Sequence, residues 1–571
     1  MLKTKVSYFA IASLLVVGAT AVNAKPIIHD AEYYVIEAQH GDRWMSEDKE
    51  IQKKLAQLKE KYGTPPNIVH VMWDDTPVGE VGIPEIQILR GFKTPNINKM
   101  ASEGINFMRM YTEPSCTPSR AAVLTGRHAV RNGMYNVAFP YEYGGMAKGE
   151  VTMAEVLSQA GYATGFYGKG HLGDVEESYM TNQGFDEAFW TPYNQVPSMY
   201  LPHMEHAGVI TATTMNPDLF PDDPYELDKE WRPDGLVWWL EGTKGGEVRE
   251  YLPPTSLDNW YKSQAQEEIK AFAFIEKNAN AKKPFYVALW PSGSFIPKPG
   301  KKETLAGGIL PEVLADVDQT VGRLMEKLKA LKIEKNTLVI LMADNGPMTH
   351  NGPPGFVETL YRGGKGDFLE GGVRVPAMAW WPGVIEPGQT VGDIIHETDL
   401  FTTFATLAGA SQYIPRDRII DGIDQTSLLL NGDSFSRRDY VHIYTGPLYA
   451  ATVKGHFKRH WLGELPGLSG AAFFDLFNDP REAQPKMLPM FPTKGMFMTM
   501  KARHDIWKEK YPDTKEARGL PFTGIANARP ETIKASQLRL NQDKVPFDVK
   551  AVMERSATYK EFNMEKAWGT K

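Results

Sequence analysis

Short apolar runs alternate with amphipathic stretches over most of the chain. The run at 67–73 (NIVHVMW) is rich in β-branched residues and lacks polar alternation, and runs at 284–290 and 337–343 have the same character. Such runs are typical of strands buried on both faces of a parallel sheet. Between the last two, 311–331 places leucines and valines three and four residues apart, which predicts a long helix. The alternation predicts an α/β fold with a large, doubly wound, mostly parallel sheet flanked by helices.

The two ends of this pattern predict smaller attached parts. Residues 46–62 have one apolar helical face, Ser46 offers an N-cap and Gly63 a stop, so we expect a helical extension over 25–64. Beyond about residue 430 the pattern changes to strand-like pieces, RDYVHIYTG and GAAFFDLFNDP, and then to a charged, methionine-rich tail. We therefore predict a large domain at 25–430 and a smaller C-terminal α+β subdomain with a tail at 431–571.

Residues 1–24 have the three-part pattern of a secretory signal peptide. Lys3 and Lys5 precede the apolar run FAIASLLVVGATAV, and Val22-Asn23-Ala24 places small residues at a cleavage site. The run is shorter than the about 20 apolar residues of a membrane span, and no comparable run follows. We expect a periplasmic or secreted protein with no stable membrane span after signal removal; the alternative is an uncleaved N-terminal anchor.

Charge and cysteine content exclude several classes of protein. The 571 residues carry 63 Lys and Arg against 70 Asp and Glu, a net charge of -7, so the basic excess of a nucleic-acid binder is missing. The single cysteine excludes an internal disulfide, a cysteine-rich zinc site and an iron–sulfur cluster. If this cysteine matters, its role is chemical.

Acidic residues follow two of the predicted strands. Asp74 and Asp75 come after 67–73, and Asp344 and Asn345 come after 337–343. The carboxyl ends of parallel strands meet at the edge of the sheet where ligands bind, and clustered carboxylates repel unless a cation lies among them. Such oxygen donors suit Ca²⁺, and less well Mg²⁺. The alternative is that these acids cap the following loops.

The lone cysteine lies in EPSCTPSRAAVLTGRH, at 113–128. Thr117 is a candidate N-cap with Pro118 in the first helical position, which puts Cys116 at the positive end of a helix dipole. That end favours anions and lowers the pKa of a thiol, and Arg120 is one turn further on. The segment predicts an anion site around Cys116; the alternative is a small residue buried at a helix start.

With these features the sequence resembles the sulfatase family of the alkaline-phosphatase-like superfamily. SCTPSRAAVLTG at 115–126 matches the first family signature, whose core C-x-P-S-R directs conversion of the cysteine to Cα-formylglycine, and GYATGFYGKGH at 161–171 resembles the second. The resemblance covers roughly 65–485 in the family's order. Its other blocks are TPNINKMASEG (94–104), ADNGP (343–347), RGGKGDFLEGGVRVP (362–376) and FFDLFNDPRE (473–482).

The resemblance implies a sulfuric-ester hydrolase of the arylsulfatase type that acts on a small-molecule or glycan sulfate ester. It implies maturation by a formylglycine-generating enzyme, with the modified Cys116 as nucleophile. Arg120 would hold the formylglycine, Lys169 and His171 match the K-x-H pair beside it, and Lys365 matches the lysine that contacts the sulfate and the leaving-group oxygen. The resemblance also implies a calcium ion bound by Asp74, Asp75, Asp344, Asn345 and an oxygen of modified Cys116.

A mechanism follows from these roles. One hydroxyl of the hydrated aldehyde attacks sulfur, the alcohol or phenol leaves, and the second hydroxyl loses a proton as sulfate is expelled. His171 is the candidate base for that proton, because imidazole titrates near neutrality.

One departure from the family concerns the leaving group. Members usually carry a histidine after the strand that corresponds to 284–290, whereas this chain has WPSGSFIPKP there, with the expected position near Ser294–Ile296. Lys365 alone, or His203, His206 or His350, would then protonate the leaving group. A phenol, with a pKa of about 10, needs less help than an alkyl alcohol, so the gap favours aryl sulfates.

Two alternatives stay open. One is a phosphonate or phosphodiester hydrolase on the same scaffold, whereas a two-zinc phosphatase is disfavoured by Asn345 where a histidine ligand is needed. The other is a non-catalytic protein that binds anions or glycans, with Cys116 left unconverted.

Overall fold

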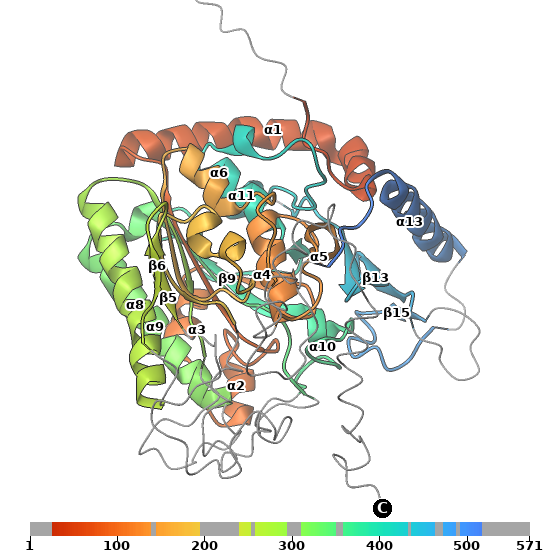
Figure 1. The fold of residues 1–571 in the computed structure, drawn as a ribbon. Helices are drawn as coiled ribbons and strands as arrows, with labels where there is room; N and C mark the ends of the chain where they lie inside the picture. The colour runs from red at the N-terminus through yellow and green to blue at the C-terminus, as the bar shows by residue number, and fades with distance from the viewer. Residues whose placement is uncertain are drawn as a thin grey trace, which may run out of the picture.

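The computed structural model describes most of the chain in nine stretches (Figure 1). These are residues 25–138, 144–193, 239–252, 257–293, 310–349, 358–431, 435–462, 472–486 and 491–516. The predicted signal sequence at 1–24 and the tail beyond 516 lie outside the described residues.

A mixed sheet of 11 strands forms the centre of the molecule, in the order β10-β2-β9-β8-β1-β7-β3-β4-β5-β6, with β11 paired to β2. The five strands from β8 to β4 run parallel, and β9 is antiparallel to both of its neighbours, β8 and β2. This arrangement confirms the predicted α/β fold. The strands are β1 Asn67–Trp73, β2 Ile105–Tyr111, β3 Ala163–Lys169, β4 Glu187–Thr191, β5 Leu240–Thr243, β6 Val248–Glu250, β7 Phe285–Trp290, β8 Thr337–Ala343, β9 Arg374–Trp380, β10 Gln389–Val391 and β11 Ile395–His396.

Helices cover both faces of the sheet, which is why its central strands lack polar alternation (Figure 1). The helices α8 (Leu257–Asn280), α9 (Leu310–Ala330) and α3 (Pro95–Ser102) pack together on one side, and α4 (Cys116–Thr125), α6 (Met153–Gln159) and α11 (Asp399–Leu407) pack together on the other. The shorter helices are α2 Pro84–Arg90, α5 Ala129–Asn132, α10 Glu370–Val373 and α12 Thr426–Leu430, with 3₁₀ turns at Glu176–Ser178, Met180–Asn182, Glu334–Asn336 and Ser411–Tyr413.

The N-terminal helix is longer than predicted. Helix α1 spans Ala31–Tyr62 and ends at Gly63 as expected, but Ser46 is not its N-cap. The cap is Asp30, whose side chain accepts hydrogen bonds from the backbone N–H groups of Glu32 and Tyr33 at 2.8 and 3.1 Å. The first turns persist because Ile36 and Trp44 are buried against the C-terminal part of the chain, packing that the local sequence does not reveal.

A smaller antiparallel sheet of four strands follows the large one, in the order β12-β13-β14-β15. Its buried side chains share an apolar cluster with Tyr111 at the end of β2 and Val373 just before β9, so the small sheet packs directly against the large one. Helix α13 then packs against α1 (Figure 1). The elements are β12 Tyr440–Thr445, β13 Leu448–Lys454, β14 Phe457–His460, β15 Phe473–Asp475 and α13 Phe491–Lys510.

Candidate active site

The two acidic pairs predicted from sequence meet at one edge of the sheet. Strands β1 and β8 are parallel neighbours with Trp73 opposite Ala343, so the residues after each strand come together. The backbone N–H of Asp344 donates to Trp73 O at 2.9 Å, and that of Asp75 donates to the Asp344 carboxylate at 3.2 Å. Asp75 has φ of 51°, a left-handed conformation that is uncommon for residues other than glycine.

Cys116 is brought to this cluster by the start of α4. The helix begins two residues earlier than predicted: Ser115 is the N-cap position, and Thr117 is not. The Thr117 hydroxyl instead donates to His171 O and accepts from the Ala138 N–H, both at 3.0 Å. The Cys116 thiol is fully buried, with Sγ 3.8 Å from Asp75 Oδ1.

The expected lowering of the Cys116 pKa is wrong. Burial and the nearby Asp344 carboxylate raise the pKa of the thiol to about 12, and the lysines beside it only partly offset this. Desolvation and like-signed neighbours both disfavour the thiolate in such a closed site. Without a cation in the site, an unmodified Cys116 is therefore a neutral thiol, which is a poor nucleophile.

Two lysines predicted from sequence point into the cluster. Lys365 Nζ lies 2.7 Å from Cys116 Sγ and 2.8 Å from Asp75 Oδ1, and Lys169 Nζ lies 2.7 Å from Asp74 Oδ1. The loop that carries Lys365 lies against Pro347, where a Cβ on Gly364 would be 2.2 Å from the Pro347 carbonyl oxygen. This glycine is required for close packing of the backbone.

Arg120 is fully buried and joins the two strand ends. Its Nη2 donates to Asp74 at 2.7 Å and to Asp344 at 2.9 Å, and Nη1 donates to Lys169 O at 2.7 Å. The guanidinium also stacks over the ring of Trp290, 5.2 Å from its centroid. Burial opposes ionisation of Asp74, but Lys169 and Arg120 outweigh it and lower the pKa of that carboxyl. Arg120 thus holds together the Asp74 and Asp344 carboxylates, which lie beside Cys116.

His171 lies beside Lys169 in a strained backbone conformation, with φ of 54°. Its Nε2 is 2.7 Å from Ala138 O; because a carbonyl only accepts, Nε2 carries the proton. Nδ1 is then an unprotonated, buried acceptor with no hydrogen-bond partner among the described residues. Burial and Lys169 lower the pKa of His171 well below its usual value, so the imidazole is neutral.

The donor set fits a hard divalent cation. One ligand atom from each of Asp74, Cys116 and Asp344 lies within 4.8 Å of the others, and donors at the usual calcium distance of about 2.4 Å lie no more than about 5 Å apart. Asn345 Nδ2 donates to Asp75 Oδ1, which leaves Asn345 Oδ1 buried and without a partner in the described part of the chain. Burial and Asp74 raise the pKa of Asp344 to about 6, and a bound cation would favour the ionised carboxylate.

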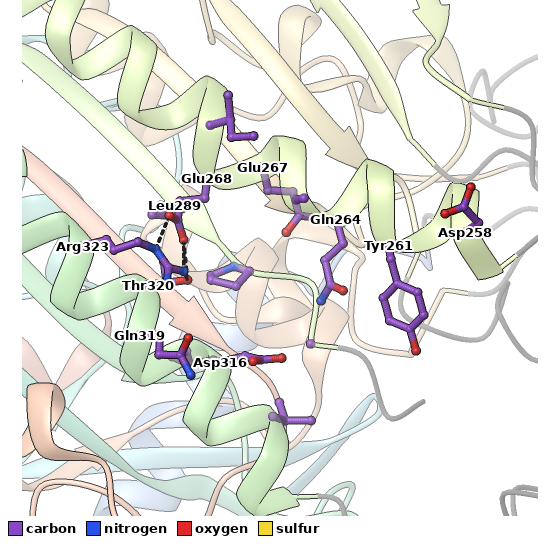
Figure 2. A pocket seen from close by; sticks show the side chains of 16 residues that line it. Asp258, Tyr261, Gln264, Glu267, Glu268, Leu289, Asp316, Gln319, Thr320 and Arg323 are labelled. Atoms are coloured by element: carbon purple, nitrogen blue, oxygen red, sulfur yellow. Dashed lines mark hydrogen bonds and ion pairs between the residues drawn. The ribbon is translucent and has the colours of Figure 1, made fainter. Parts of the chain in front are cut away.

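Sequence reasoning missed a buried carboxylate behind the cluster. Glu267 on α8 accepts hydrogen bonds from Trp239 Nε1 at 2.8 Å and from the N–H of Ser292 at 3.0 Å, and also from the Ser292 hydroxyl. It lines a cleft of about 680 Å³ between α8 and α9, where Glu268 on the same helix contacts Arg323 (Figure 2). The signal for Glu267 was only its position on an amphipathic helix.

Most of the candidates for protonating the leaving group lie outside the described residues. They are the expected histidine position at Ser294–Ile296 and the three possible substitutes, His203, His206 and His350. Trp239 and Trp290 are fully buried core residues. None of the helices in the described stretches combines the length and the apolar character of a membrane span.

Comparisons with known proteins agree with this geometry. The chain is 35% identical over 437 residues to human arylsulfatase A, which covers 73% of this chain and 78% of that one, and 32% identical over 414 residues to dog N-acetylgalactosamine-6-sulfatase, which covers 70% and 72%. The crystal structure of the PsFucS1 sulfatase from Pseudoalteromonas sp. matches with a TM-score of 0.70 and 28% identity, over 86% of this chain and 98% of that one. The Sulfatase family model matches residues 66–410, so the chain belongs to the sulfatase family and is a sulfuric-ester hydrolase.

Proposed function

We propose that the chain hydrolyses sulfate esters of phenols, with Cα-formylglycine at position 116 and a calcium ion held by Asp74, Asp75, Asp344 and Asn345. The observation that carries the proposal is the convergence of Cys116 with Asp74 and Asp344 within 4.8 Å, beside the ammonium of Lys365. A substrate sulfate that reaches this point meets a nucleophile position, a cation site and a lysine together.

Conversion of Cys116 supports turnover because a thiol does not serve here. The buried thiol is neutral, and a sulfated thiol would have no easy way to release sulfate. A hydrated aldehyde supplies one hydroxyl to attack sulfur and a second whose deprotonation releases sulfate. Calcium, when bound, supplies a Lewis acid that polarises oxygen atoms at this position.

The protein's own residues then have separable tasks. Lys365 and Lys169 are placed to stabilise negative charge on the sulfuryl oxygens. Arg120 holds the Asp74 and Asp344 carboxylates in place. Nδ1 of His171, which has no partner among the described residues, is the acceptor for the proton that is lost as sulfate departs. A phenolate leaves with little protonation, which suits a sequence without a histidine at the usual position.

A substrate panel tests this proposal. Purified protein is assayed with aryl, alkyl and sugar sulfates and with an aryl phosphonate at equal concentration, alongside Cys116→Ala. We expect the aryl sulfate to have the highest kcat/KM and the variant to be inactive. A sugar sulfate cleaved far faster would contradict the aryl assignment, and preferred phosphonate turnover would favour the phosphonate hydrolase.

Mass spectrometry of the peptide that contains position 116 tests the modification directly. We expect the mass that results when cysteine loses sulfur and two hydrogens and gains one oxygen. Unmodified Cys116 from the native host, with no turnover of any sulfate ester, would favour the non-catalytic alternative. We also propose export through residues 1–24, which N-terminal sequencing of the mature protein tests, with Lys25 the expected first residue.

A further inference from the structure

The loop that carries Lys365 is held by the small C-terminal sheet. Lys458 on β14 has no exposed side-chain surface. Its Nζ donates to Phe368 O at 2.8 Å and to Glu370 Oε1 at 3.1 Å, and lies 3.0 Å from Glu482 Oε1. An ammonium has three N–H donors, and here each has one acceptor, so its position is fixed.

The acceptors around Lys458 continue the attachment into the loop. Glu482 Oε2 accepts a hydrogen bond from the backbone N–H of Glu370 at 2.6 Å, and Tyr111 donates to the Glu370 carboxylate at 2.8 Å. Thr445, on β12 of the same small sheet, donates to Gly366 O at 2.7 Å, next to Lys365. The small sheet therefore contacts the loop at both ends of the segment 366–370.

The other side of the loop is fixed to the active site. The backbone N–H of Lys365 donates to Pro347 O at 2.8 Å, and that of Gly366 donates to Pro114 O at 2.6 Å, two residues before Cys116. A Cβ on Gly372 would lie 2.1 Å from Asp367 O, so the loop also packs tightly on itself. A loop held this closely transmits a displacement at one side to the other.

We propose that Lys458 is a positioning residue for the sulfatase reaction, and that the C-terminal sheet acts through it to set the place of the Lys365 ammonium. The inference rests on the proposed role of Lys365 at the sulfate. Burial lowers the pKa of Lys458, but Glu482 and Glu370 outweigh this effect and raise the pKa, so the ammonium keeps its charge. Without that charge, the buried Glu370 and Glu482 carboxylates lose a shared cation and the loop loses one of its attachments.

The variant Lys458→Met tests the inference against the matched control Lys454→Met. Lys454 lies on β13 of the same sheet and pairs with Asp439, away from the loop. We expect kcat on an aryl sulfate to fall about 10- to 100-fold in Lys458→Met, the cost of a small misplacement at a reacting centre, and to stay near wild type in the control. We also expect faster hydrogen–deuterium exchange over 362–373 in Lys458→Met alone.

A double-mutant cycle separates positioning from general damage. In a Lys365→Met background, Lys458→Met should cost little further activity, because its effect passes through the ammonium that is already gone. An undiminished loss in that background would overturn the inference, as would unchanged exchange over 362–373. A wild type without sulfatase activity would instead contradict the proposed function, and the exchange result would still decide whether Lys458 holds the loop.

A milder variant keeps the test valid if Lys458→Met does not fold. Thr445→Val removes one hydrogen bond to Gly366 at an exposed position and keeps the shape of the side chain. We expect a fall in kcat of about two- to fivefold, in line with one hydrogen bond. Wild-type kcat together with wild-type exchange over 362–373 in Thr445→Val would overturn the proposed control of Lys365 by the sheet.

Discussion

Glu267 gives the molecule a dependence of stability on pH that can be worked out from the structure. Its carboxylate is 3% exposed and accepts hydrogen bonds from Trp239 and from the N–H and hydroxyl of Ser292. Burial raises the pKa of Glu267 from its ordinary 4.5 to about 7, and the charge on Asp74 adds to this, against the three donors. The folded state therefore binds this proton more tightly than the unfolded state does.

The sign and size of the change in stability follow from proton linkage. Below a pH of about 4.5 the carboxyl is protonated in both the folded and the unfolded state, so burial of Glu267 costs no stability through ionisation. As the pH rises to about 7 the unfolded state loses its proton first, and the folded state becomes less stable relative to it. The shift of about 2.5 pH units, at 1.36 kcal/mol for each unit, gives a loss of about 3 kcal/mol. Because the group is buried, solvent screening reduces this little.

The variant Glu267→Gln removes the titration and keeps the shape. In the variant, the amide NH₂ group faces the Ser292 N–H, and two donors cannot form a hydrogen bond with each other. At pH 5 we therefore expect the variant to be less stable than wild type by about 1–3 kcal/mol. At pH 8 the wild type has lost its about 3 kcal/mol, so the two proteins should be close or reversed in order. Urea unfolding midpoints at pH 5 and pH 8, in chelating buffer, measure the difference.

The neighbouring Glu268 is the matched control for this experiment. It lies on the same helix, and its carboxylate contacts Arg323, whose side chain is 48% exposed (Figure 2). Glu268→Gln should cost less than about 1 kcal/mol, as for other exposed ion pairs, and should keep the wild-type pH dependence. If the free energies of unfolding of wild type and Glu267→Gln stay parallel from pH 5 to pH 8, the reasoning about burial of Glu267 is refuted.

Three further predictions concern the acidic cluster. Arg120→Met leaves buried carboxylates with one partner fewer and should lower the free energy of unfolding by about 3–5 kcal/mol in chelating buffer, measured by urea unfolding; a loss below about 1 kcal/mol would contradict the burial of this pair. Asn345→Leu removes the unpartnered Oδ1 and should reduce the rise in Tm that calcium gives the wild type, and an equal rise in both would exclude Asn345 as a ligand. Thr117→Val removes the hydroxyl that holds His171 O and should lower kcat more than it raises KM in steady-state assays, whereas unchanged kinetics would show that His171 needs no such support.

The central strands were predictable because burial on both faces leaves a direct mark on the sequence. Every residue of β1, β7 and β8 is buried, and the apolar runs coincide with these strands almost to the residue. The start of α1 was not predictable in this way. Its first turns are held by tertiary packing of Ile36 and Trp44, and the actual cap, Asp30, lies outside the amphipathic stretch.

The candidate site, like the fold, was predictable only in part. Short motifs and strand ends were enough to bring Cys116, Asp74 and Asp344 together, because chain direction fixes where parallel strands end. The acidity of Cys116 was mispredicted because it depends on burial, which a helix-cap pattern does not report. The contacts of Lys458 could not be predicted from the sequence either, because its three acceptors come from two distant segments of the chain.

The balance of charge in the cluster has a consequence for turnover. Three carboxylates face three cationic side chains there, so the protein's formal charge is zero: Asp74, Asp75 and Asp344 against Arg120, Lys169 and Lys365. With the proposed divalent ion bound the site carries two positive charges, which a sulfate ester with one negative charge neutralises only in part. Inorganic sulfate, with two, neutralises them fully, and in a buried site that difference is large. The product should therefore bind more tightly than the substrate, which makes sulfate a competitive inhibitor and its release the slow step for phenols that leave easily.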